Sequence, residues 1–356
     1  MKLMIALLMV FASAAGVAKG NVISTVDQRV ELLSIVFRLA GNPEYNMKLD
    51  KNYVKDIEDY FGAYRSHTVV SFAKKLHTEK GMGFSKVMFL AVALELKNNK
   101  FSIIKQSGNT LKGKWDEKDA IQFVALLNDF YKVAAFEKFF KDHETNYKDA
   151  TSLFDHSVAT FDQKWYLDYY GDHEVDYRVV IGFGNGGANY GPSVKPVGQK
   201  KLVYAIMGSW TFDEQGKPFF PEAVYLPYLI HEFNHSFIDH ILEEDTTIEQ
   251  QLKSSGEALL EAQKMAMKLE GYEDWHSLID ESLVRASVVR YLMDHGATAT
   301  VVQQEITTQT QKGFVWIKDL VSLLGAYETS RDTYPTFKSF YPRIIAFFDA
   351  KAGEQK

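Results

Sequence analysis

Two histidines and a glutamate lie in the short segment His231-Glu232-Phe233-Asn234-His235, at a spacing that suits metal chemistry. Residues four apart on a helix project from the same face, so His231 and His235 can present two imidazoles to one Zn²⁺. Glu232 lies beside them and can take a proton from a water whose pKa the metal has lowered. The segment therefore predicts metal-assisted hydrolysis with Glu232 as the catalytic base.

The pattern is rare by chance, and the apolar residues around it would lie on the opposite side of a helix. With 10 His in 356 residues and Glu at a frequency of ~0.07, roughly 0.02 occurrences are expected per chain. The apolar side chains of the predicted helix 224–242 gather on the side opposite the motif; they are Leu226, Leu229, Ile230, Phe233, Phe237 and Ile241. A helix that lines a cleft has this character. Two surface histidines beside a glutamate are the plain alternative.

A catalytic zinc needs a third protein ligand and one open position. No Gly-x-x-His completion follows His235, so a downstream glutamate is expected. Glu281 lies in the apolar stripe of the predicted helix 275–293, where a carboxylate is costly without a partner such as a cation. Glu257, on a polar helix face, is the reserve candidate. An ion pair with Arg285, four residues on, is the plain explanation for Glu281.

Four more residues are candidates for supporting roles in such a site. Asp239, one turn after His235, could accept a hydrogen bond from a ligating imidazole; an ordinary surface acid explains it equally well. Arg285 could orient the carboxylate ligand from behind. Tyr190, Tyr291 and Arg285 are candidate donors to the oxyanion of a tetrahedral intermediate.

A Gly-rich stretch at 182–187 formally matches the dinucleotide pattern G-x-G-x-x-G. No helix follows that could hold a pyrophosphate at its N-terminus, so we reject that interpretation. The stretch could instead form a cleft edge at Gly184, Gly186 and Asn189, where a peptide substrate approaches the backbone closely. A plain hairpin loop between two strands is the alternative.

The elements that must position these residues predict an α-rich α+β fold. Strands are expected at 177–183 and 202–207, directly before the motif helix, which is the order of a zincin-like catalytic part. Further helices are expected at 84–96, 120–140 and 247–270, and Ser24 or Thr25 is expected to cap the first helix. We divide the chain into four parts: a signal peptide at 1–20, a helical region at 21–171, a zincin-like catalytic region at 172–300, and a C-terminal helical region at 301–356 packed on it.

Composition and the first residues bear on location and partners. Met1-Lys2 followed by an apolar run to Phe11 and small residues to Gly20 is typical of a secretory signal peptide. No later run is long enough to span a bilayer, so a secreted or periplasmic protein without a membrane anchor is expected. The chain has no Cys, and its net charge of −6 gives no reason to expect nucleic acid as a partner.

Two resemblances follow from these segments. With HEFNH at 231–235 and DESLVRA at 280–286, the chain resembles gluzincin-type zinc metallopeptidases. Most of the mature chain more closely resembles a family of secreted bacterial proteins of unknown function, through VDQRVELLSIVFRLAGNPEY at 26–45, NYG at 189–191, HEFNHSF at 231–237 and AYETSRDTYPTFKSFYP at 326–342.

The resemblance implies that His231, His235 and Glu281 are metal ligands and that Glu232 is the base. In the thermolysin-like pattern the third Glu follows an Asn and precedes an Asp four residues on. Here Asp280 precedes Glu281 and an arginine occupies the later position, so the third ligand stays open between Glu281 and Glu257.

The sequence thus predicts a secreted zinc-dependent hydrolase that cleaves peptide bonds in a peptide or protein. Two alternatives remain. The chain could be a secreted binding protein on a degenerate zincin scaffold, although such a protein has no chemical need for Glu232. It could also be an amidase that acts on cell-wall material.

Overall fold

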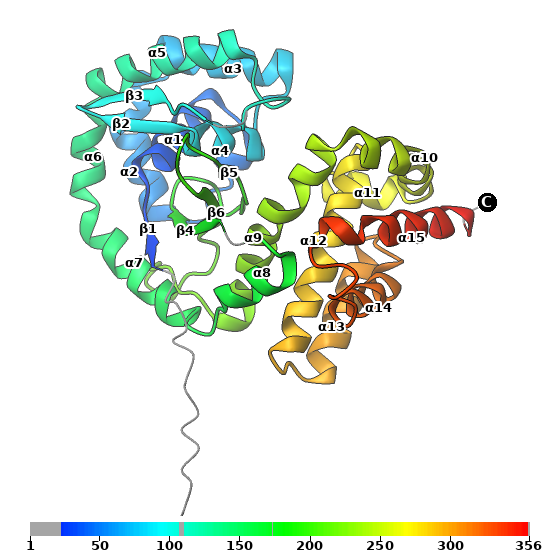
Figure 1. The fold of residues 1–356 in the computed structure, drawn as a ribbon. Coiled ribbons are helices and arrows are strands. Elements are labelled where there is room, and N and C mark those ends of the chain that lie inside the picture. The colour runs from blue at the N-terminus through cyan, green and yellow to red at the C-terminus, as the bar shows by residue number, and fades with distance from the viewer. Residues whose placement is uncertain (1–22, 107–109, 173, 355–356) are drawn as a thin grey trace, which may run out of the picture.

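The computed structural model describes residues 23–106, 110–172 and 174–354 (Figure 1). The signal peptide predicted at 1–20 lies outside these ranges. Within them, none of the helices combines the length and the apolar character that crossing a bilayer requires. The chain is rich in helix and contains a small mixed sheet, which confirms the predicted α-rich α+β class.

The first half of the chain forms the part of the molecule that holds the sheet (Figure 1). Its helices and strands are β1 Ser24–Thr25, α1 Gln28–Ala40, α2 Lys51–Phe61, α3 Thr68–Lys80, α4 Phe84–Val92, β2 Leu94–Lys97, β3 Lys100–Ile103, α5 Glu117–Val133, α6 Phe136–Asp142, α7 Glu144–Ser157, α8 Gln163–Tyr170, β4 Val175–Gly182, β5 Ser193–Val194 and β6 Lys201–Gly208, with 3-10 turns η1 Pro43–Asn46 and η2 Gly62–Tyr64.

The second half is helical throughout. Its elements are α9 Glu222–Glu244, α10 Thr246–Ala262, α11 Lys264–Glu270, α12 Trp275–Asp294, α13 Ala299–Gln311, α14 Ile317–Glu328, the 3-10 turn η3 Lys338–Phe340 and α15 Tyr341–Gly353. Figure 1 shows α9 leading from the sheet into this group of helices.

The start of the chain differs from the prediction. Ser24 and Thr25 form the short strand β1 rather than a helix cap, and they pair with β4 in parallel. Asp27 caps α1 instead, since its side chain accepts a hydrogen bond from the backbone N–H of Arg29 at 2.8 Å.

Three predicted helices are shorter than expected. The helix at 120–140 divides at Ala135, whose φ of 46° is left-handed, and the one at 247–270 divides at Gln263. The helix at 84–96 ends at Val92, where β2 begins a hairpin with β3. Asn98 and Asn99 take positive φ in that hairpin turn, as asparagine readily does. Apolar spacing extends across these breaks, which is why it did not predict them.

The main sheet has the strand order β1-β4-β6-β5. The predicted strands 177–183 and 202–207 correspond to β4 and β6, but they pair in parallel. The connection 183–200 is therefore not a hairpin loop. It places β5 and Tyr190 antiparallel to β6. Because β4 and β6 are parallel, they end at the same edge of the sheet, and the loop after β6 leads into α9.

Helix α9 packs against both β6 and α12. The buried Asn234 side chain fixes this arrangement: its Nδ2 donates to the carbonyl of Val284 on α12 at 3.2 Å, and its Oδ1 accepts from the Tyr170 hydroxyl of α8 at 2.9 Å. A buried amide with both ends satisfied sets the position of one helix against the other. The motif helix is thereby held against α12, where the third predicted ligand lies.

Candidate metal centre

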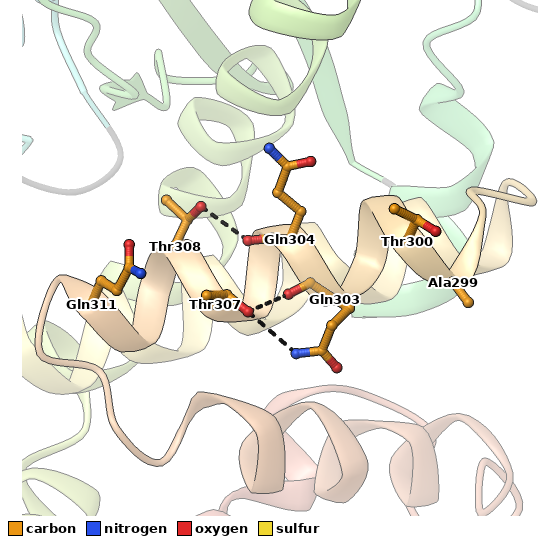
Figure 2. A pocket seen from close by; sticks show the side chains of 7 residues that line it. All are labelled: Ala299, Thr300, Gln303, Gln304, Thr307, Thr308 and Gln311. Atoms are coloured by element: carbon orange, nitrogen blue, oxygen red, sulfur yellow. Dashed lines mark hydrogen bonds between the residues drawn. The ribbon is translucent and has the colours of Figure 1, made fainter.

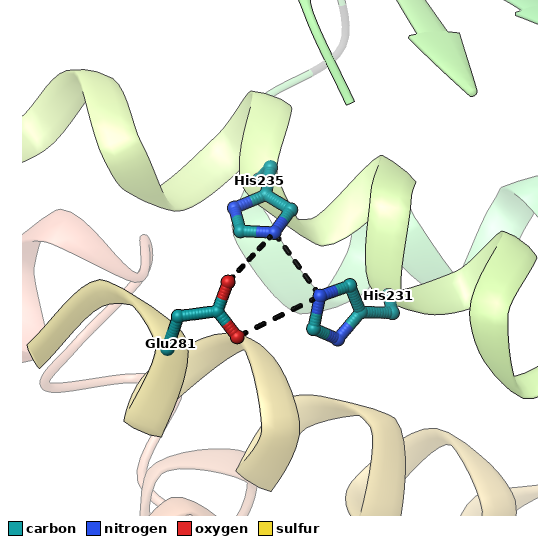
Figure 3. Close-up of side chains that lie close together, drawn as sticks. All are labelled: His231, His235 and Glu281. Carbon is teal, nitrogen blue, oxygen red and sulfur yellow. Dashed lines mark hydrogen bonds and ion pairs between the residues drawn. The ribbon is translucent and has the colours of Figure 1, made fainter. Parts of the chain in front are cut away.

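His231 and His235 lie one turn apart on α9, and their rings approach each other (Figure 3). Their Nε2 atoms are 3.1 Å apart, and the ring planes meet at 78°. Two imidazoles bound to one tetrahedral ion at ordinary Zn–N lengths would hold their nitrogens about 3.3 Å apart. The two rings are thus arranged as a pair of ligands.

Helix α12 brings Glu281 to the same point, as Figure 3 shows. Its Oε1 lies 3.4 Å from His235 Nε2, and its Oε2 lies 3.7 Å from His231 Nε2. One ligand atom from each of the three residues falls within 4.8 Å of the other two. The Glu281 side chain is 9% exposed and the imidazoles are 15% and 17% exposed, so all three side chains are largely buried. These three residues form a group that could bind a metal ion.

Outer partners hold each side of this group. His235 Nδ1 lies 3.0 Å from Asp239 Oδ1, so a proton on Nδ1 leaves Nε2 free to bind a cation. Behind Glu281, Arg285 Nε lies 2.9 Å from Oε2. The other Arg285 nitrogens donate to Gln309 Oε1 at 2.6 Å and to the Tyr272 hydroxyl at 2.9 Å. The arginine is therefore fixed and cannot rotate away from the carboxylate.

The charges of the three residues support one another. Burial by itself would raise the pKa of Glu281, but Arg285 and the two histidines outweigh it and lower that pKa to about 2. Burial lowers the pKa of His231 well below its ordinary value. Glu281 is thus ionised and His231 neutral at pH 7, which are the forms that bind a cation. Burial lowers the pKa of His235 as well, but Asp239 and Glu281 raise it to about 10, so a cation must displace a proton there.

Glu232, the predicted base, is 5% exposed. Among the described residues its carboxylate has no hydrogen-bond or ion-pair partner, and burial raises its pKa to about 8. An acid left without a partner beside a ligand group is available to exchange a proton.

Gly191 explains how the sheet lies so close to this helix. A Cβ on Gly191 would lie 2.0 Å from the carbonyl oxygen of Glu232 and 3.0 Å from Cβ of His235. Its neighbour Tyr190 exchanges backbone hydrogen bonds of 2.9 and 2.8 Å with Ile206 of β6. The segment around Gly191 is thus clamped between β6 and α9, at the level of the motif.

The predicted cleft edge does not lie open. Gly184 and Gly186 are buried, and their backbones make internal contacts. The Gly184 N–H donates to Glu31 Oε2 at 3.1 Å, and a Cβ on Gly186 would lie 1.9 Å from the carbonyl oxygen of Glu44. Asn189 accepts the Gly208 N–H at 3.0 Å. Gly184 and Gly186 therefore pack against α1 and η1 and do not form an open edge, whereas Asn189 is half-buried.

Three other predicted residues, Tyr190, Tyr291 and Glu257, are not part of the group of His231, His235 and Glu281. Tyr190 is buried, and its pKa is raised by burial and then by Glu44, with a smaller contribution from Glu232. Tyr291 lies ten residues after Glu281 on α12, where its buried hydroxyl accepts the backbone N–H of Asp162 at 2.6 Å. The reserve ligand Glu257 lies 3.9 Å from Lys253, on an exposed face of α10.

Sequence reasoning missed three residues that build this site: Asn234, Tyr272 and Gln309. Asn234 lies inside the motif, where a polar residue directed at the buried side of the helix was the signal. Tyr272 precedes α12, and Gln309 is a buried residue of α13; both contact Arg285 from other elements. No local sequence pattern predicts such contacts between distant elements.

An open pocket on the outer face of α13 differs from the candidate metal centre in the residues that line it (Figure 2). The described residues that line it are Ala299, Thr300, Gln303, Gln304, Thr307, Thr308 and Gln311. None of them is a histidine, a carboxylate or a cation. The neutral amides and hydroxyls of this pocket offer no metal ligands and no acid–base pair.

The fold and the site define an α-rich α+β protein with a candidate metal centre of two histidines and one glutamate. The chain belongs to the family described as Domain of unknown function (DUF4932), whose model matches residues 22–347. No curated protein and no solved structure matches the chain.

Proposed function

We propose that this chain is a secreted zinc-dependent hydrolase that cleaves peptide bonds, of the gluzincin type. The observation on which the proposal depends is the convergence of His231, His235 and Glu281 from α9 and α12, with ligand atoms within 4.8 Å of one another. Two imidazoles and one carboxylate are a common ligand set for catalytic zinc, and a fourth position remains for water or substrate. The exposed fractions of the two imidazoles support access from solvent.

When bound, zinc would lower the pKa of a coordinated water and polarise the carbonyl of the scissile bond. Glu232 takes the proton of the attacking water and then delivers it to the leaving amine. Its carboxylate is unpaired among the described residues, which suits a group that must hold a proton only for a short time. A divalent cation nearby would lower the pKa of Glu232 from about 8 toward the range of a general base.

The outer residues keep the ligands in place during this exchange. Asp239 fixes the orientation of the His235 ring, and Arg285 fixes the Glu281 carboxylate. Gly191 lets the segment 189–192 lie directly against the backbone of Glu232 and the Cβ of His235. Such support favours a preorganised site.

The test compares Glu232→Gln with the unaltered mature protein. About one zinc per chain is expected in both, because the substitution keeps the ligands. Cleavage of a mixed peptide library should fall by about 100- to 10,000-fold in the variant, which is the typical contribution of a general base. Glu257→Gln, an exposed acid on α10, is the matched control and should retain full activity. Full activity in Glu232→Gln, or a protein without metal, would disprove the proposal.

A further inference from the structure

Two aromatic side chains meet at the turn of α9 that precedes His231. Tyr228 precedes His231 by three residues on α9, so the two side chains are neighbours on one helix face. Tyr228 is 45% exposed. Trp210, in the loop between β6 and α9, lies with its ring centroid 5.3 Å from that of Tyr228, and the rings meet at 79°. Together they form an aromatic corner, which we define as Trp210 and Tyr228.

The corner is fixed from behind. Trp210 stacks on the buried Tyr225 with ring centroids 4.1 Å apart and planes at 21°. Its backbone N–H donates to the Tyr225 hydroxyl at 3.1 Å. A tryptophan held by its own ring face and its own backbone cannot collapse onto the site or swing into solvent. The corner therefore exists before any ligand arrives, which lowers the entropic cost of binding.

The position of the corner relative to the two histidines distinguishes it from other exposed aromatic residues. Single exposed aromatic residues are common on protein surfaces and need no explanation. Tyr228, however, continues the line of His231 and His235 along α9, at one end of the ligand pair. A substrate whose scissile carbonyl lies at the histidines, and whose chain runs along α9 toward the N-terminus of that helix, passes within one side chain's length of the corner.

We propose that the Trp210–Tyr228 corner is the subsite for a large apolar or aromatic side chain adjoining the bond that is cut. The inference rests on the proposed function. The two rings contact each other edge to face, so their free surfaces meet at nearly a right angle, and a phenylalanine or leucine side chain can pack into that angle and bury its apolar surface. Sugar rings are held differently, flat on an open aromatic face with several polar groups around them. Among the described residues the corner offers only one indole N–H and one phenol hydroxyl.

The experiment uses matched peptides that differ by Phe or Ala next to the scissile bond. The unaltered enzyme should cleave the Phe peptide with a kcat/KM about 10- to 100-fold higher, the discrimination that an apolar pocket gives. Tyr228→Ala should reduce that ratio to about threefold or less while zinc content stays at one per chain. Tyr228→Phe keeps the ring and should keep the preference. Leu153→Ala, an apolar residue exposed to a similar degree on α7, is the control and should change nothing.

Binding measured in the Glu232→Gln background separates this inference from the proposed function. One outcome is that the unaltered protein cleaves no peptide, yet the Glu232→Gln variant binds the Phe peptide more tightly than the Ala peptide and Tyr228→Ala removes that difference. The subsite then stands and the proposed function fails. If peptides are cleaved with no dependence on Tyr228, the subsite is wrong and the hydrolase stands. Binding of muropeptides, but not of apolar peptides, that depends on Tyr228 would also overturn the proposed side-chain class.

Discussion

Glu31 and Glu281 are both buried glutamates on helices, and their surroundings differ. Glu31 on α1 is 0% exposed. It accepts hydrogen bonds from the Tyr53 hydroxyl at 2.8 Å, from the Phe183 N–H at 2.8 Å and from the Gly184 N–H at 3.1 Å. Glu281 on α12 has Arg285 behind it, and its oxygens point toward two imidazoles at 3.4 and 3.7 Å.

The difference teaches that burial of an acid does not by itself mark a reactive site. The neutral donors around Glu31 use its acceptor capacity and tie α1 to the Gly-rich stretch, which is a structural task. Glu281 has charged neighbours, and its free side converges with two other ligand atoms. A candidate metal ligand is distinguished by oxygens that face other potential ligand atoms instead of hydrogen-bond donors.

The largest expected effect separates the two acids by metal binding. Glu281→Gln should lower zinc affinity by more than about 100-fold, the upper range for residues that act only from behind a ligand. Glu31→Gln should leave zinc affinity unchanged, because no ligand touches Glu31. Competition titration with a coloured chelator measures both. Equal affinities in the two variants would remove the distinction between the two sites.

The next effect concerns stability and pH at Glu31. Burial raises its pKa to about 7 from an ordinary 4.5, so the folded protein holds a proton there that the unfolded chain releases. Glu31 therefore contributes to the free energy of unfolding in full below pH 4.5. This contribution, roughly 3 kcal/mol in total, is lost as the pH rises through 7. Glu31→Gln keeps an acceptor and cannot titrate.

Urea unfolding at pH 5 and pH 8 with a chelator present measures this difference. The unaltered protein should lose more stability than Glu31→Gln across that interval, and the excess is the share of Glu31. Parallel losses in the two proteins would show that Glu31 is already ionised at pH 5, and the contrast with Glu281 would then weaken.

The smallest effect tests the outer partner of His235. Asp239→Asn keeps a side-chain acceptor but removes the charge next to Nδ1, so zinc affinity should fall about 10- to 100-fold. The fall should be smaller than that caused by Glu281→Gln. The same titration measures it, with Glu243→Gln, an exposed acid near the end of α9, as the control. A larger loss in Asp239→Asn than in Glu281→Gln would reverse the assignment of ligand and support.

Local reasoning worked where one helix contains the whole signal. The spacing of His231 and His235 and the phase of the apolar residues predicted α9 and the convergence of the two rings. The same reasoning selected Glu281 because it interrupts an apolar stripe. Glu31 interrupts the apolar stripe of α1 in the same way, so the sequence could not tell a carboxylate facing neutral donors from one facing histidines.

The helix-rich class, the motif helix and the residue types that could bind a metal could be predicted from local sequence, because they depend on contacts within one turn. Long-range packing sets three other features: α12 crosses α9 at Glu281, Tyr272 and Gln309 secure Arg285, and Gly184 and Gly186 are buried against α1 and η1. Those outcomes depend on side chains far apart in the chain, such as Asn234 and Val284. Local periodicity carries no information about which distant partners meet.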